Sequence, residues 1–315
     1  MTTNFDRLRL GTAPDSWGVW FPDDPAQVPW ERFLDEAARA GYSWLELGPY
    51  GYLPTDPQQL ADELARRNLQ LSGGAVFAGL HRGQEALDQA IADCRQEAEL
   101  LTALGARHLV LLPEGYTDLD GHLTQPKQLT AEQWRSLLAG MDQLGRVLAD
   151  ECDVDLVFHP HADSHVGTQQ EVERFLADTD PELVNLCLDT GHISYCGGDN
   201  LSIIEKFPER IGYVHLKQVD PAVLAQVEAQ GLCFAEAVRR GAMVEPPQGI
   251  PVMEPLLEAL AVLDVDLFAI VEQDLYPCEP DVPLPIAERT RQYLGSCGLG
   301  PGRLTRENPP RKATS

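Results

Sequence analysis

The sequence predicts an α/β protein built as one closed (β/α)8 barrel of the TIM type. Short apolar runs of strand length alternate eight times with segments of helical periodicity. The chain has 315 residues, a common length for one such barrel. An open, doubly wound sheet is the alternative. Neither the GxGxxG nor the GxxxxGK[ST] signature of many nucleotide-binding sheets occurs in the sequence, which favours the barrel.

The expected strands are mostly apolar along their whole length, as strands of a parallel sheet covered on both faces are. In chain order they span residues 8–13, 42–48, 69–77, 107–113, 154–161, 183–189, 211–217 and 267–274. Each is followed by a segment that we expect to be helical. These segments span residues 29–40, 58–67, 84–104, 131–150, 169–177, 201–207, 253–263 and 284–294.

Local signals support several helix boundaries. Thr130 with Gln133, and Thr168 with Glu171, have the spacing of capping boxes, which satisfy free N–H groups at helix starts. Gly41 and Gly105 stand where helices should end.

Two segments fall outside the repeating pattern. Residues 219–252 form a long insertion after the seventh strand, with a helical piece at 221–229 and then a Gly- and Pro-rich stretch. In a barrel this insertion lies at the C-terminal face, where it would act as a lid. We therefore expect a single domain over residues 1–298. The polar segment 299–315, rich in Pro and Gly, is expected to be disordered.

The charge excludes some classes of partner. The chain has 24 Lys and Arg against 49 Asp and Glu, a net charge of −25. This argues against nucleic acid, and so against an apurinic endonuclease, and against an anionic membrane surface. The seven cysteines form no CxxC pair, and neither a signal peptide nor an apolar run of about 18 residues is evident. We expect a cytoplasmic protein with a small-molecule substrate; the oligomeric state stays open, a homo-oligomer included.

Polar side chains end six of the eight expected strands. They are Glu46, Glu114, His159, His161, Asp189, His192, His215, Lys217, Glu272, Gln273 and Asp274. Each alone is more often structural, but active sites of barrels lie at these strand ends. His159 and His161 are two residues apart and share one strand face, as do His215 and Lys217. The joint pattern predicts a site for a divalent metal and a polar substrate. Mn²⁺ suits these ligands and an oxygen-rich substrate, with Co²⁺, Zn²⁺, Fe²⁺ or Mg²⁺ as alternatives.

Several longer stretches carry a resemblance to a known family. They are GTAPDSW (11–17), LELG (45–48), LVFHPH (156–161), TQQEVERFLADTDPELVNLCLDTGH (168–192), IGYVHLK (211–217), GLCFAEAVRRGAMVEPPQG (231–249) and VEQD (271–274). In these stretches the chain resembles the xylose isomerase-like TIM barrels, the sugar isomerase/epimerase superfamily. Within that superfamily it is most similar to the inosose dehydratases.

The resemblance implies a set of site residues. The metal positions of the superfamily fall on His159, Asp189, His215 and Glu272. His159 stands where most of the superfamily has Glu, as in the inosose dehydratase branch. The expected catalytic residues are Glu272, His161, His192 and Lys217, and the expected substrate contacts are Glu46, Trp17, Glu114 and Gln273. Core packing is an equal alternative for Trp17.

The implied activity is dehydration of a keto-cyclitol or keto-sugar, by abstraction of the proton α to a metal-bound carbonyl. Glu272 or His161 would take the proton, and His192 or Lys217 would assist the departing oxygen. An isomerase or epimerase, a lyase that cleaves 3-keto-glycosides by β-elimination, and a non-catalytic sugar-binding barrel are the alternatives. One departure from the inosose dehydratases is the stretch 72–77, SGGAVF, which lacks their lysine after the third strand.

Overall fold

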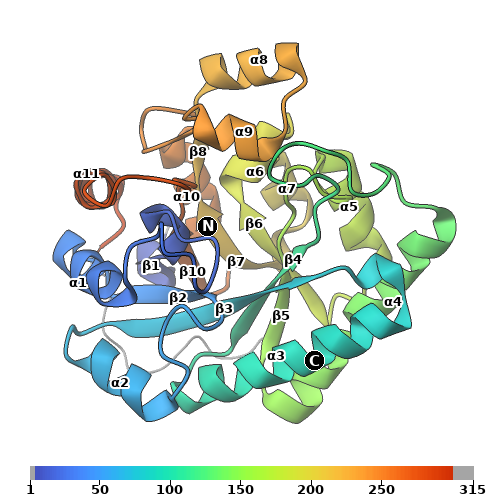
Figure 1. Cartoon of the computed structure of the whole chain (residues 1–315), viewed down its shortest axis with the longest axis horizontal. Helices are drawn as coiled ribbons and strands as arrows, with labels where there is room; N and C mark the ends of the chain where they lie inside the picture. The colour runs from blue at the N-terminus through green and yellow to red at the C-terminus, as the bar shows by residue number, and fades with distance from the viewer. Residues whose placement is uncertain (1–3, 301–315) are drawn as a thin grey trace.

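Eight parallel strands close into a barrel with helices around it (Figure 1). The computed structural model describes residues 4–300. The barrel strands are β1 (Leu8–Thr12), β2 (Trp44–Pro49), β3 (Gln70–Ala78), β4 (His108–Pro113), β5 (Asp155–Phe158), β6 (Val184–Asp189), β7 (Ile211–Leu216) and β10 (Leu267–Val271). Their order around the barrel follows the chain, and β1 pairs with β10 to close it. The predicted (β/α)8 barrel is confirmed.

Helices follow the strands as expected. They are α1 (Trp30–Ala40), α2 (Pro57–Ala65), α3 (Gln84–Ala103), α4 (Ala131–Val147), α5 (Gln169–Asp178), α6 (Thr190–Tyr195), α7 (Asn200–Lys206), α10 (Met253–Ala261) and α11 (Pro283–Ser296). Both predicted capping boxes are present, at Thr130 and Thr168. Gly41 ends α1 in the left-handed conformation, with φ of 92°. Among residues 4–300, no helix has the length and apolar composition to cross a membrane.

Two strands end three residues earlier than predicted. We expected the fifth strand to reach residue 161, but β5 ends at Phe158 because Pro160 has no N–H to continue the ladder. The eighth was expected to reach residue 274, but β10 ends at Val271. Beyond it the backbone N–H of Gln273 donates to Ser16 Oγ at 3.0 Å. In both cases the polar residues follow the strand on a short irregular segment.

An apolar plug fills the barrel interior. It consists of Ala13, Trp44, Val110, Val157, Cys187, Tyr213, Phe268 and Ile270, with Ala75 and Leu112 packed against it. The rings of Trp44 and Phe268 pack edge to face at 4.9 Å. Because alternate strand residues face the interior, the residues two positions after the plug face the barrel's C-terminal mouth.

The insertion after β7 is more ordered than the sequence suggested. It comprises β8 (Gln218–Val219), α8 (Pro221–Gln230), α9 (Phe234–Arg239) and β9 (Met243–Val244), with β8 and β9 antiparallel. The stretch expected to be irregular therefore contains a short helix. In Figure 1, α8 and α9 stand above the end of the barrel near α6. Of the segment predicted to be disordered, residues 301–315 lie outside the described residues.

We expect the buried acid Glu97 to lower stability at neutral pH. This residue of α3 is 1% exposed and lies against β3 at Gly74, where a Cβ atom would come 2.0 Å from its Oε1. Burial raises the pKa of Glu97 well above its ordinary value, against the opposing effect of a hydrogen bond from Ala75. The folded state therefore holds the proton more tightly than the unfolded chain. Stability is greatest below the unfolded pKa and falls as pH rises towards the folded one.

Glu97→Gln should accordingly raise the melting temperature at pH 7 by about 2 °C or more, the shift that about 1 kcal/mol produces in a domain of this size. It should give no gain near pH 4. Thermal unfolding at both pH values measures this, with Glu99→Gln, an exposed site on the same helix, as the control. A Glu97→Gln protein less stable than the wild type at pH 7 would contradict the prediction.

Candidate active site

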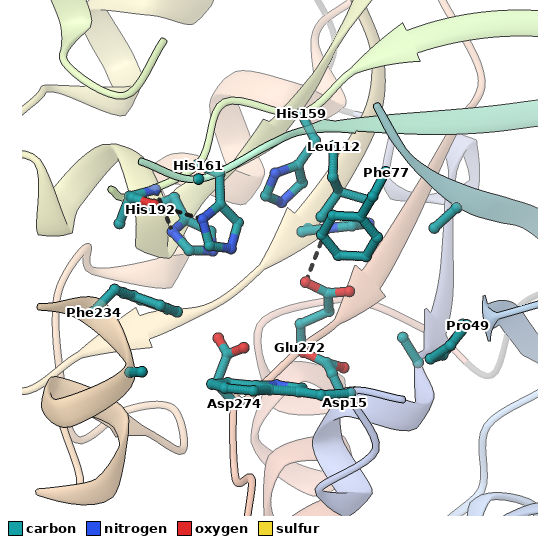
Figure 2. Close-up of a pocket in the computed structure, with 18 of the residues that line it drawn as sticks. Asp15, Pro49, Phe77, Leu112, His159, His161, His192, Phe234, Glu272 and Asp274 are labelled. Atoms are coloured by element: carbon teal, nitrogen blue, oxygen red, sulfur yellow. Dashed lines mark hydrogen bonds and ion pairs between the residues drawn. The ribbon is translucent and has the colours of Figure 1, made fainter. Parts of the chain in front are cut away.

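The polar strand ends meet in one cavity of about 300 Å³ at the C-terminal end of the barrel (Figure 2). Each of five plug residues is followed two positions later by a polar residue of the site. The followers are Glu46 on β2, His159 after β5, Asp189 on β6, His215 on β7 and Glu272 after β10. The strand alternation that packs the barrel interior thus also aims these side chains into its mouth.

Four of these side chains form a compact cluster of metal-binding groups. One ligand atom from each of His159, Asp189, His215 and Glu272 lies within 4.8 Å of those of the other three. His159 Nε2 is 3.2 Å from Asp189 Oδ2, and His215 Nδ1 is 2.9 Å from Glu272 Oε2. His159 is 1% exposed, and its Nδ1 has no hydrogen-bond partner among the described residues. Two imidazoles and two carboxylates at this spacing fit a divalent cation.

A third carboxylate orients one of these imidazoles. Glu46 Oε2 lies 2.9 Å from Nε2 of His215, on the opposite side of the ring from Nδ1. A carboxylate on the second nitrogen fixes the orientation of a ligating histidine and increases its basicity. Glu46 therefore lines the cavity as predicted, but its contact within the protein is with His215.

Lys217 is the central positive charge of the cavity. Its Nζ lies 2.9 Å from Asp274, 3.1 Å from Glu272, 3.2 Å from Asp189 and 4.0 Å from Asp15. Burial alone would lower the pKa of Lys217, but Asp189 and the other carboxylates outweigh it and raise this pKa well above its usual value. The ammonium group is therefore held charged and in place.

The pKa values of two acids that line the cavity, Glu272 and Asp15, are shifted in opposite directions. Burial would raise the pKa of Glu272, but the charges of His215 and Lys217 lower it to about 2. Asp15 follows β1 in a short 3-10 helix, and burial, together with the negative charge of Glu272, raises its pKa well above normal. One carboxyl is therefore fixed as an anion while its neighbour favours the protonated form.

His161 and His192 form a pair beside the cluster, with ring centroids 4.0 Å apart. Burial, helped by His159, lowers the pKa of His161 to about 4, and burial lowers that of His192 well below normal. His192 Nδ1 accepts the N–H of Ala162 at 3.2 Å, so a neutral ring carries its proton on Nε2. His161 Nδ1 is 2.6 Å from the carbonyl oxygen of Ala162 and donates to it, so its Nε2 keeps a lone pair.

Phe234 joins this pair to the insertion. It is the first residue of α9, and its ring lies 4.8 Å from His192 and 5.1 Å from His161. Its backbone N–H donates to Asp163 Oδ2 at 2.7 Å, while Arg239 Nη2 donates to the Leu119 carbonyl at 2.9 Å. These two hydrogen bonds hold α9 of the insertion over the cavity.

Three predicted substrate contacts do not line the cavity, which corrects the expectation. Trp17 is fully buried, packs on Phe33, and donates its indole N–H to Glu36 at 2.9 Å. It belongs to the core, the alternative that the sequence left open. Glu114 forms an ion pair with Arg82.

Gln273, the third, donates its side-chain amide to the Met243 carbonyl at 3.1 Å. It lies one residue out of phase with Glu272 and Asp274, so it faces the insertion while they face the cavity.

The sequence analysis missed several parts of the cavity wall. Asp15 was not considered, although it follows the first strand as a polar strand-end residue. Asp274 was placed at a strand end but given no role. The apolar residues Phe21, Phe77 and Leu119 also line the cavity, and no polar pattern marks them.

Comparisons with known proteins agree with this architecture. Residues 34–293 match the family model described as xylose isomerase-like TIM barrel. The chain is 30% identical over 292 residues to inosose dehydratase 2 of Bacillus cereus, covering 91% of this chain and 96% of that protein. It is 29% identical over 299 residues to an inosose dehydratase of Clostridium botulinum, covering 92% and 97%.

Solved structures share the fold at lower identity. A crystal structure of the IolI protein with a bound zinc atom superposes with a TM-score of 0.67 at 17% identity, covering 91% of this chain and 98% of that one. The probable 3-DHS dehydratase AsbF of Bacillus anthracis has the same TM-score and coverage at 15% identity. With the family model matched over most of its length, this chain belongs to the xylose isomerase-like TIM barrel family.

Proposed function

We propose that this protein is a divalent-metal-dependent lyase that removes water from a keto-cyclitol or keto-sugar. The observation that carries the proposal is the buried cluster of His159, Asp189, His215 and Glu272 beside Lys217 in one cavity. The similarity to inosose dehydratases over more than 90% of the chain supports the dehydratase activity over other reactions of the family.

The cluster is proposed to bind the metal, with Mn²⁺ as the favoured ion. A divalent ion bound there supplies a Lewis acid that lowers the pKa of a substrate proton next to a carbonyl. The zinc atom of the similar IolI structure supports a divalent ion without deciding which one. Glu46 would hold His215 in the orientation that presents Nδ1 to the cluster.

The remaining groups are suited to proton transfer. His161 Nε2 keeps a lone pair and would accept the α-proton. The Lys217 ammonium would give a proton to the hydroxyl on the neighbouring carbon, while the Nε2–H of His192 donates a hydrogen bond to the same oxygen. The carbon–oxygen bond then breaks, the electrons of the broken C–H bond form the new double bond, and one water leaves. Glu272 is less suited as base because it is one of the proposed metal ligands and already contacts His215 at 2.9 Å and Lys217 at 3.1 Å.

The insertion over residues 219–252 is proposed to act as a lid of the single barrel domain. Phe234 covers both histidines on one side and would exclude bulk water from the proton-transfer groups.

The reaction can be tested by mass spectrometry of 2-keto-myo-inositol incubated with Mn²⁺-loaded protein in D2O. We expect loss of one water from the substrate, abolished by a chelator. Deuterium uptake without water loss would instead indicate an isomerase or epimerase. An unchanged substrate would contradict the inosose assignment.

The metal site can be tested without turnover. Mn²⁺ at a hundredfold excess over its Kd should stabilise the wild type by about 2.7 kcal/mol, seen as a rise in melting temperature. His215→Ala and Glu272→Ala should lose both this rise and the bound metal measured by mass spectrometry, while keeping their circular dichroism spectra. Glu114→Gln, a strand-end acid outside the cavity, is the control. Full metal binding by both cluster variants would refute the proposed ligand set, and ligand binding without turnover by the metal-free variants would favour a binding protein.

A further inference from the structure

The wall of the cavity is apolar on one side and polar on the other. β3 places Ala75 and Phe77, and β4 places Leu112, on the inward faces where the other strands carry acids and histidines. Figure 2 shows Phe77, Leu112 and Pro49 on one side of Glu272, and Phe234 with the two histidines on the other. The polar groups therefore occupy only part of the surface that a bound molecule would contact.

Exposed apolar side chains also line the cavity, and we call three of them the apolar rim: Phe21, Phe77 and Leu119. Eight large apolar side chains are exposed among residues 4–300, and these three line this one cavity. Phe77 is the most exposed of the eight, at 63%. Clustered exposed apolar side chains mark binding surfaces, whereas scattered ones need no explanation.

Aromatic rings continue the rim. Trp20 lines the cavity and stacks on Tyr276, with ring centroids 5.0 Å apart and planes at 24°. Phe21 packs edge to face on the same tyrosine at 5.4 Å. These contacts fix Trp20 and Phe21 in place, so the rim offers aromatic surface that needs little ordering on binding.

A bare keto-cyclitol at the polar groups would leave such a wall uncovered. Every carbon of its ring carries an oxygen, and each polar group placed against apolar surface without a partner costs about 1–3 kcal/mol. An aromatic group placed there gains about 25 cal/mol for each Å² of apolar surface removed from water. The rim therefore favours a ligand with a polyhydroxy ring at one end and an apolar group at the other.

We propose that the natural substrate is a polyhydroxy keto ring bearing an aromatic substituent, and that Phe21, Phe77 and Leu119 bind the substituent. The proposal rests on the proposed function for the position of the polyhydroxy ring beside the metal cluster. It narrows the proposed substrate class to keto rings with an aryl substituent, of which 2-keto-myo-inositol represents the bare ring.

Binding of two unreactive probes tests the proposal. Phenyl β-D-glucopyranoside and methyl β-D-glucopyranoside share a sugar, lack the ketone, and differ only in the substituent. Calorimetric titration of the Mn²⁺-loaded wild type should show at least about tenfold tighter binding of the phenyl compound, which corresponds to about 1.4 kcal/mol. Phe77→Ser should remove most of this preference, because it should weaken binding of the phenyl compound much more than binding of the methyl compound.

Leu201→Ser is the matched control, because Leu201 is an exposed apolar side chain on α7 outside the cavity. It should keep the wild-type preference. Equal affinity of the wild type for both probes, or a preference that survives Phe77→Ser, would overturn the proposal. Sedimentation of the wild type and of Phe77→Ser measures whether either protein forms an oligomer. If Phe77→Ser dissociates an oligomer, the rim is an interface between copies of the chain and the substrate proposal is wrong.

The result is independent of the proposed reaction. A phenyl preference with no dehydration of 2-keto-myo-inositol would remove the inosose assignment and leave the rim proposal standing. Dehydration of 2-keto-myo-inositol with no phenyl preference would support the inosose assignment and overturn the rim proposal.

Discussion

The site depends on the two-residue period of the barrel strands. Trp44, Val157, Cys187, Tyr213 and Ile270 fill the barrel interior, and each is followed two positions later by a polar residue of the site. A one-residue slip in any of these strands would bury the polar group in the wall or turn it towards the helices. Close packing of the plug therefore fixes the positions of the cluster residues, and the free energy of the core supports the geometry of the site.

Charge balance is the second constraint on this arrangement. Asp15, Glu46, Asp189, Glu272 and Asp274 surround the cavity, and Lys217 is the ammonium group among them. Burying several carboxylates is costly unless cations or hydrogen bonds compensate them. The pKa of Asp15 is raised first by burial and then by the charge of Glu272, which agrees with an excess of buried acids over Lys217. A divalent cation at the cluster would supply the missing positive charge, an argument for the metal that does not depend on any relative.

Most of the barrel was predictable because strand alternation and capping are local. The capping boxes at Thr130 and Thr168 and the eight strand positions follow from short-range patterns. The polar strand ends predicted the mouth of the barrel as the site, and the family resemblance selected the four cluster residues among them. Gln273 could have been excluded from the cavity, since it is out of phase with its neighbours on both sides.

Other features needed the three-dimensional structure. The direction of Trp17 depends on a short 3-10 helix after β1, whose geometry no periodicity reveals. The helix α9 could not be predicted from the sequence, because it lies in a Gly- and Pro-rich segment and is too short to show a helical period. Phe77 has the alternation of a core residue, and only the structure shows that it is 63% exposed among the described residues.

Phe234 of the insertion and Phe77 of the apolar rim lie on different sides of one cavity (Figure 2). Phe234 covers the histidines, where water would compete for the transferred proton, and its helix is tied down through Asp163. The side formed by β3 and β4 has Phe77 exposed beside it. A lid that covered both sides would admit only a small polar ring. Under the proposed function, coverage of the histidine side alone would keep proton transfer dry and leave a path for a bulky group to extend from the ring, which agrees with the proposed aryl substituent.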